Sequence, residues 1–158
     1  MATEVRSYGS VWLEGGWMSA YGREDSEWGL LVEAGREFLV ERANLSRLTS
    51  YTELNVTLVK RTGFRLFDFE RADERAAMGY LLGLIVERDQ QIAPSDPPLM
   101  LSALVTYLNA NDAGPGFYQL AKDLRLLPMS ASKDEKDSFW IKQVQRLYKR
   151  DGARPSPS

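Results

Sequence analysis

Apolar residues recur at three- and four-residue intervals along much of this chain, and this is the spacing of one face of an α-helix. Between Ser26 and about Asn44, the apolar positions with this spacing are Trp28, Leu31, Val32, Gly35, Phe38 and Leu39. Ser50 and Glu53 then have the spacing of a capping box, which predicts that a second helix begins there and ends near Gly63. The pattern therefore predicts a mainly helical protein.

Three more helices are expected further along the chain. One runs from about Asp73 to Arg88, a short one starts at Phe117 and is closed by Pro128, and a second capping box, Ser132 with Glu135, opens the last. Their apolar positions are Met78, Leu81, Leu82 and Ile85 in the first, Phe117, Leu120, Ala121 and Leu124 in the second, and Trp140, Val144, Leu147 and Tyr148 in the third.

Two features between these helices carry further expectations. Gly79 and Gly83 lie four residues apart on one helix and are expected to let another stretch of backbone approach closely. The nearly continuous apolar run from Leu99 to Leu108 is short and bounded by turn residues, and it predicts a buried strand. The segment Gly114-Pro-Gly116 is interpreted as a turn.

The chain divides where these patterns start and stop. Residues 1–25 form an aromatic and glycine-rich N-terminal segment, residues 26–150 a single helix-rich domain, and residues 151–158 a tail that is expected to be disordered. Aromatic side chains would be badly exposed in a free segment, so residues 1–25 are expected to dock. They either wrap their own domain or present their aromatic side chains to a partner.

The chain contains no cysteine and no histidine. Thiol nucleophiles, zinc–thiolate sites and the commonest general base are therefore excluded. Asp68, Glu70, Asp73 and Glu74 remain as candidates for a magnesium site or for acid–base chemistry, but acids clustered before a helix more often balance the helix dipole. We expect no catalytic residue, no metal and no cofactor, and hence a protein that is not an enzyme.

The charge of the chain gives no general attraction for nucleic acid, because the formal net charge is −2. Residues 41–67 and 129–158 are nevertheless mildly basic and flank an acidic stretch at residues 68–100, which permits a local face that contacts phosphates. Neither a signal peptide nor a run of about 20 apolar residues is recognisable, so we expect no membrane contact and a cytoplasmic location.

Four short segments of the chain, taken in their order along the sequence, resemble motifs of a known protein family. They are Ser50-Tyr-Thr-Glu-Leu54, Arg75-Ala-Ala-Met-Gly79, Leu99-Met-Leu-Ser-Ala-Leu-Val105 and Gly116-Phe-Tyr-Gln-Leu-Ala121. Together, residues 50–127 resemble the DNA-binding half of the alkylguanine DNA alkyltransferases and of the alkyltransferase-like proteins. The resemblance implies an α+β, mainly helical fold with a winged helix-turn-helix-like centre and extra N- and C-terminal helices.

The family's reactive segment is not retained. Where it reads Pro-Cys-His-Arg, this chain has Ser102-Ala-Leu-Val105, so the alkyl-accepting thiol and its imidazole are missing and alkyl transfer is excluded. The resemblance implies a non-enzymatic DNA-binding module in which Arg75 takes the place of the wedge arginine. The residues expected to contact DNA are Arg75, Arg71 and Arg88 on one helix, and Lys60, Arg61 and Arg65 beside it. Asp73, Glu74, Glu87 and Asp89 on or beside the same helix would oppose this binding through their charge.

The alternative is a protein-interaction adaptor, or a subunit of a larger bacterial assembly, built on the same fold. Large aromatic residues commonly anchor such interfaces. The candidate anchors are Trp12, Trp17, Trp140 and Tyr148. Each of these side chains could instead pack in the core of its own domain. The sequence therefore leaves DNA and protein as the two classes of partner.

Overall fold

The computed structural model describes residues 12–13, 16–17, 20–107 and 112–152. Within these residues the protein is mainly helical, with a small two-stranded parallel sheet. The helices are α1 (Asp25–Asn44), α2 (Tyr51–Thr62), α3 (Ala72–Ile92), α4 (Pro115–Asp123) and α5 (Lys133–Asp151), with the 3-10 helices η1 (Ala20–Gly22) and η2 (Leu101–Leu104). The strands are β1 (Trp12–Leu13), β2 (Gly16–Trp17), β3 (Thr49–Ser50) and β4 (Val105–Thr106).

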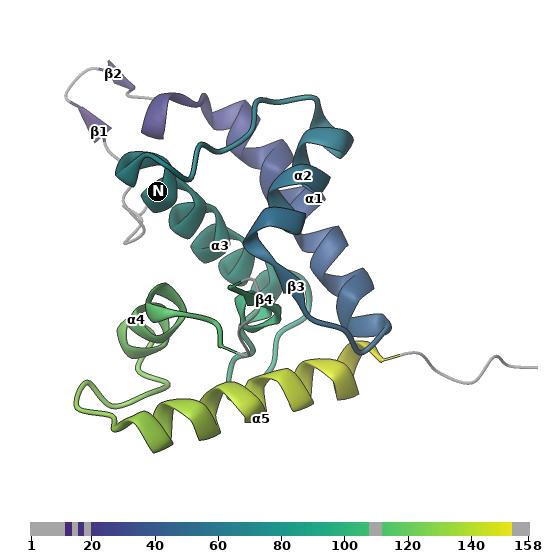
Figure 1. Ribbon diagram of the computed structural model, residues 1–158, viewed down its shortest axis with the longest axis vertical. Coiled ribbons are helices and arrows are strands. Elements are labelled where there is room, and N and C mark those ends of the chain that lie inside the picture. The colour runs from purple at the N-terminus through teal and green to yellow at the C-terminus, as the bar shows by residue number, and fades with distance from the viewer. Residues whose placement is uncertain (1–11, 14–15, 18–19, 108–111, 153–158) are drawn as a thin grey trace, which may run out of the picture.

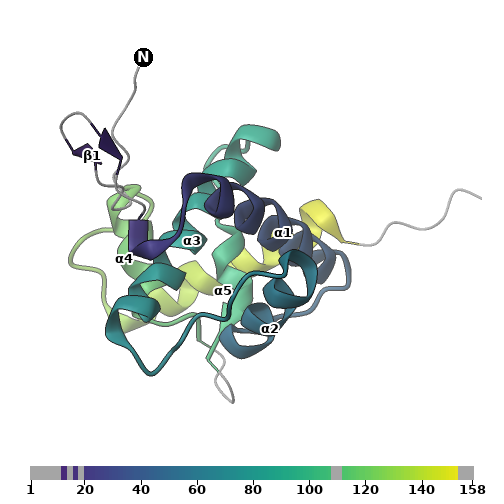
Figure 2. The same cartoon turned by 90° about the horizontal axis from the view of Figure 1, so that it is seen from above.

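Helices α1 and α3 pack against each other at the centre of the molecule, and α2 lies against α1 (Figure 1). Helix α5 runs across the ends of this group and contacts α1. Strand β1 pairs antiparallel with β2, and β3 pairs parallel with β4. Seen from above, α4 and the η1 end of α1 lie on the side of the molecule away from α2 (Figure 2). This arrangement confirms the helical class that the sequence predicts.

The apolar faces predicted for the helices form the core. All six positions predicted in α1 and all four predicted in α3 are buried. In α2, Leu54 and Leu58 are buried and Tyr51 is half-buried, and in α5 Leu147 is buried. None of the helices in the described ranges combines the length and the apolar character that crossing a bilayer requires.

Both helix starts predicted from capping residues are present, with one difference. At α5, the Ser132 hydroxyl accepts a hydrogen bond from the Glu135 amide at 3.1 Å, and the Glu135 carboxylate accepts one from the Ser132 amide at 2.8 Å. At α2, the Ser50 hydroxyl accepts from the Glu53 amide at 3.0 Å. The Glu53 carboxylate, however, forms an ion pair with Arg42 of α1, so a contact between helices replaces the second half of this capping box.

The strand predicted from Leu99 to Leu108 is wrong for most of its length. Every residue of η2 is buried, and among residues 99–107, which the structure describes, only the two residues of β4 are paired as a strand. Because η2 contacts α1, α3 and α5, it is covered on several sides. A short segment buried in this way has no periodicity that distinguishes a strand from a helical turn.

Three helix boundaries also differ from the expectation. Helix α3 continues past its predicted end to Ile92, and α4 begins at Pro115, whose fixed φ suits the first turn of a helix. Helix α5 includes Asp151, the first residue of the tail expected to be disordered. The Asn44 side chain donates to the Asp151 carbonyl at 3.0 Å, which ties this end to α1. Residues 153–158 lie outside the described residues.

Candidate binding cleft

Four of the six basic residues expected to contact DNA form ion pairs with carboxylates of the protein. The pairs are Arg71 with Asp73 (2.6 Å), Arg88 with Glu33 (2.9 Å), Arg61 with Glu41 (2.8 Å) and Arg65 with Glu74 (3.1 Å). Arg75 is exposed and donates a hydrogen bond to the Phe69 carbonyl at 2.7 Å. Lys60 is exposed at the end of α2. Carboxylates of the same chain therefore neutralise most of the positive charge on this surface.

Two of the acids expected to oppose DNA binding are buried and paired. Glu74 is 3% exposed and accepts a hydrogen bond from Arg65. Asp89 is fully buried, and its carboxylate lies 3.0 Å from Arg36 Nε and 2.8 Å from Arg150 Nη1. The expectation that these two charges would repel a duplex is corrected, because guanidinium groups of the protein compensate them.

The acidic residues between positions 68 and 74 have separate structural roles. Asp73 pairs with Arg71, and this hydrogen bond lowers the pKa of Asp73. Asp68 accepts from the Glu70 amide at 3.1 Å, whereas Glu74 points into the interior. Over the described ranges, no group of three or more acidic residues is arranged to hold a metal ion.

The aromatic residues proposed as partner anchors differ in what surrounds them. Trp140 is half-buried against the core, and its indole N–H donates to the Ala103 carbonyl of η2 at 2.8 Å. Tyr148 also packs against the core, and burial raises its pKa. Both have packing roles in their own domain. Trp12 and Trp17 are opposite each other in the β1–β2 pair, and their side chains lie outside the described part of the structure.

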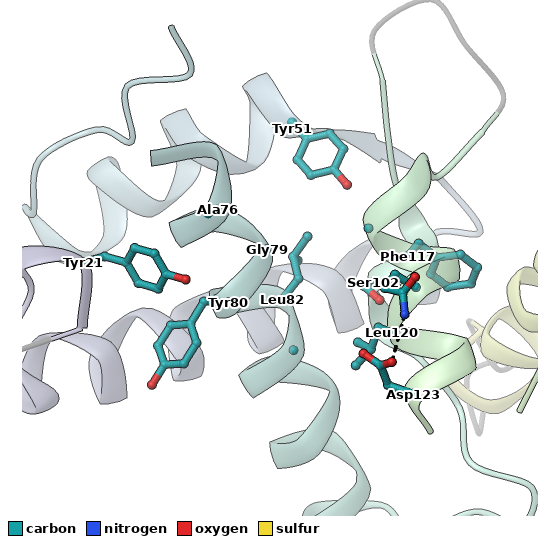
Figure 3. A pocket seen from close by; sticks show the side chains of 13 residues that line it. Tyr21, Tyr51, Ala76, Gly79, Tyr80, Leu82, Ser102, Phe117, Leu120 and Asp123 are labelled. Atoms are coloured by element: carbon teal, nitrogen blue, oxygen red, sulfur yellow. Dashed lines mark hydrogen bonds between the residues drawn. The ribbon is translucent and has the colours of Figure 1, made fainter. Parts of the chain in front are cut away.

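A cleft of about 420 Å³ lies between α3 and α4 (Figure 3). This volume is within the usual range of about 300–1,000 Å³ for protein ligand sites. Its lining residues from these helices include Ala76, Gly79, Tyr80 and Gly83 of α3, and Gly116, Gln119, Leu120 and Asp123 of α4. In both sets the positions are i, i+3, i+4 and i+7, which lie on one face of a helix. Each helix thus turns one face toward the same cleft.

Glycines keep these two faces open. A Cβ atom added at Gly79 or at Gly116 would meet no atom within 4 Å. The expectation that Gly79 lets another stretch of backbone approach closely is therefore wrong, because the space beside it is open. Close approach occurs instead at Gly35, where an added Cβ would come within 2.6 Å of the Ile85 side chain.

One wall of the cleft depends on a strained residue. Tyr21 of η1 has φ 55° and ψ 29°, a left-handed conformation that residues other than glycine rarely adopt. Its ring lies 5.5 Å from the ring of Tyr80, centroid to centroid. The Trp28 indole N–H donates to the Ala20 carbonyl at 3.0 Å and so holds this turn on α1. Strain that the surrounding structure maintains is common at ligand-binding sites.

Ser102 of η2 contributes a buried polar group to the cleft (Figure 3). Its residue exposure is 3%, and its hydroxyl has no hydrogen-bond partner among the described residues. Leaving a buried hydroxyl unpaired costs about 1–3 kcal/mol. The oxygen atom itself is shielded, so it lies behind the wall of the cleft and is not an open contact for a ligand.

The remaining polar groups define the charge of the cleft. Burial raises the pKa of Tyr51 to about 12, so this side chain is a neutral phenol at physiological pH, and its hydroxyl donates to the Ala113 carbonyl at 3.2 Å. Asp123 accepts from Gln119 Nε2 at 2.9 Å. Among the described residues that line the cleft, Asp123 is the only Asp, Glu, Lys or Arg.

Comparison of the chain with models of protein families, with curated proteins and with solved structures found no match. The cleft and the distribution of charge on the described surface are therefore the basis for inferring a function.

The sequence interpretation did not find this cleft. The available signal was the series Ala76, Gly79 and Gly83, which places small residues on one face of a long helix. The same series is equally typical of tight packing against another helix. What covers that face depends on where α4 and η1 lie, and this is a property of the tertiary structure.

Proposed function

We propose that this protein is a non-enzymatic interaction module that binds a helical segment of a partner protein in the cleft between α3 and α4. The observation that carries the proposal is the pair of open helix faces, in which Gly79 and Gly116 leave room for an incoming backbone. Grooves between elements are a recurrent binding site for amphipathic helices.

The composition of the cleft fits such a segment. Apolar and aromatic side chains, among them Phe117 and Leu120, supply apolar surface for a partner to cover. Small residues at the contact allow helix axes to approach to the short end of the usual 8–10 Å range, about 8 Å. The segment should therefore present small or medium apolar residues at i, i+3, i+4 and i+7.

Gly79→Leu is expected to abolish this binding while leaving the fold intact. Leucine at this position fills the open groove, and replacing a helix-interior glycine adds about 0.5–1 kcal/mol of stability. Peptides would be selected on the wild-type protein from a display library of helical sequences. Their affinity, measured by fluorescence anisotropy, should fall by at least about tenfold for Gly79→Leu, which is about 1.4 kcal/mol.

Gly29→Leu provides the matched control. Gly29 is an exposed glycine of α1 where an added Cβ also meets no atom within 4 Å, and it does not line the cleft. This variant should gain similar stability and retain full peptide affinity. Selected peptides that bind Gly79→Leu as well as wild type, or a library that yields no binder, would refute the helix-binding proposal.

Duplex DNA is the second candidate partner. Arg75 and Lys60 support it, because both are exposed and neither is paired with a carboxylate among the described residues. Exposed ion pairs contribute only about 0–1 kcal/mol, so Arg71 could exchange Asp73 for a phosphate. The winged-helix arrangement implied by the family resemblance and the cytoplasmic location expected from the sequence remain proposals as well.

The DNA candidate predicts a steep dependence of binding on salt. In an electrophoretic titration of a duplex, the logarithm of affinity should fall with the logarithm of salt concentration by about 0.9 per neutralised phosphate. Arg75→Ala should reduce this slope by about one, and Gly79→Leu should leave it unchanged. Absent binding at low salt, or a slope unaffected by Arg75→Ala, would rule out this route of DNA recognition.

A further inference from the structure

We infer that the cleft selects a segment carrying a positively charged side chain, a lysine or an arginine, whose cation lies beside Asp123. This inference rests on the proposed function, since it specifies the chemistry of the bound segment. It excludes acidic and phosphorylated segments from the same site.

The charge of the lining residues points to a cation. Asp123 lies at the C-terminal end of α4, where the helix dipole adds partial negative charge. No lysine or arginine is present among the described residues that line this cleft. The neighbouring cations Lys122 and Arg125 line a separate depression beside Met129, so they do not neutralise Asp123 from within the cleft.

Asp123 is also accessible and oriented. Its residue is exposed, and one carboxylate oxygen accepts the hydrogen bond from Gln119 one turn earlier on the helix. This bond fixes the side chain on the face of α4 that lines the cleft and leaves the carboxylate with further acceptor capacity. Any cation beside this carboxylate gains Coulombic attraction, and the N–H groups of a lysine or an arginine can in addition fill its open acceptor positions.

The aromatic lining adds apolar surface for the stem of the bound side chain. Tyr21, Tyr80 and Tyr51 all line the cleft, and the sticks in Figure 3 place Tyr21 and Tyr80 across it from Asp123. Because a ring attracts a cation only within about 6 Å of its centre, these rings serve a cation beside Asp123 mainly as apolar surface for the stem of its side chain.

The test uses two small probes that differ only in charge. Choline and 3,3-dimethylbutan-1-ol have the same shape and the same hydroxyl, with nitrogen replaced by carbon in the second. Both would be titrated into the full-length ¹⁵N-labelled protein, and the amide shifts of α3 and α4 would be followed by NMR. We expect choline to bind about fivefold more tightly, as the upper range for an exposed ion pair indicates.

Two substitutions separate the local charge from the overall charge. Asp123→Asn keeps the acceptor for Gln119 and should reduce the preference for choline to less than about twofold. Asp134→Asn removes the same charge from the exposed first turn of α5, outside the cleft, and should leave the preference unchanged. Gly79→Leu should block both probes, which locates the binding in the cleft.

The outcomes distinguish this inference from the proposed function. If both probes bind equally and Gly79→Leu blocks both, the cation preference is wrong while the cleft remains a binding site. If choline binds regardless of Gly79→Leu, or if neither probe shifts the amides of α3 and α4, the cation inference is also overturned. The helix-binding proposal is then decided by the selected peptides alone.

Discussion

Replacing Asp89 by alanine is expected to lower the free energy of unfolding by about 3–5 kcal/mol, the usual effect of removing one partner of a buried ion pair. Asp89 of α3 is fully buried and forms ion pairs with Arg36 of α1 and Arg150 of α5. Without the carboxylate, Arg36 loses this ion pair and Arg150 keeps only Asp151, and both guanidinium groups are about one-fifth exposed. Three helices are joined at this point, so the loss affects the whole domain.

Urea denaturation of wild type and Asp89→Ala would measure this difference. Asp73→Ala is the matched control, because it removes a carboxylate from an exposed ion pair of the same helix, and it should change stability by less than about 1 kcal/mol. The midpoint of thermal unfolding should fall by roughly 10 °C for Asp89→Ala. Equal effects of the two substitutions would show that the buried cluster contributes no more than a surface pair.

Arg23→Ala is expected to destabilise the protein by about 2–4 kcal/mol, somewhat less than Asp89→Ala. Arg23 is fully buried, and its guanidinium group lies 2.9 Å from Glu27, 3.5 Å from Glu74 and 4.0 Å from the centre of the Phe67 ring. The effect is smaller because Glu74 retains Arg65 as a partner. The substitution also removes the side chain that fixes the chain directly after Tyr21.

The experiment has a structural readout besides stability. The indole N–H of Trp28, which donates to Ala20 of the same turn, should show a changed NMR shift in Arg23→Ala. Arg47→Ala removes an exposed arginine and should stay within about 0.5 kcal/mol of wild type. An Arg23→Ala protein as stable as wild type would mean that η1 does not depend on this buried cation.

Local features of the sequence accounted for the helices. Periodicity and the capping residues Ser50 and Ser132 predicted α1, α2, α3 and α5, because both signals act within a few residues of the chain. The glycine stop of α2 at Gly63 is likewise local, with φ 78° at that residue. These elements were predictable because each turn of a helix is specified by its own residues.

Long-range contacts decided what the sequence interpretation missed. The apolar run around Ser102 became η2 because several helices surround it. Three of the arginines expected to face DNA, Arg61, Arg65 and Arg88, found carboxylates on other elements.

The sequence by itself determined a helical protein without thiol or imidazole chemistry, with a core formed by the predicted apolar faces. Only the tertiary structure decided where that protein has an open surface. The cleft combines Tyr21, Tyr51, Gly79, Ser102 and Asp123, which come from five separate elements. No local pattern relates these residues, because their proximity results from how the helices pack and not from their spacing along the chain.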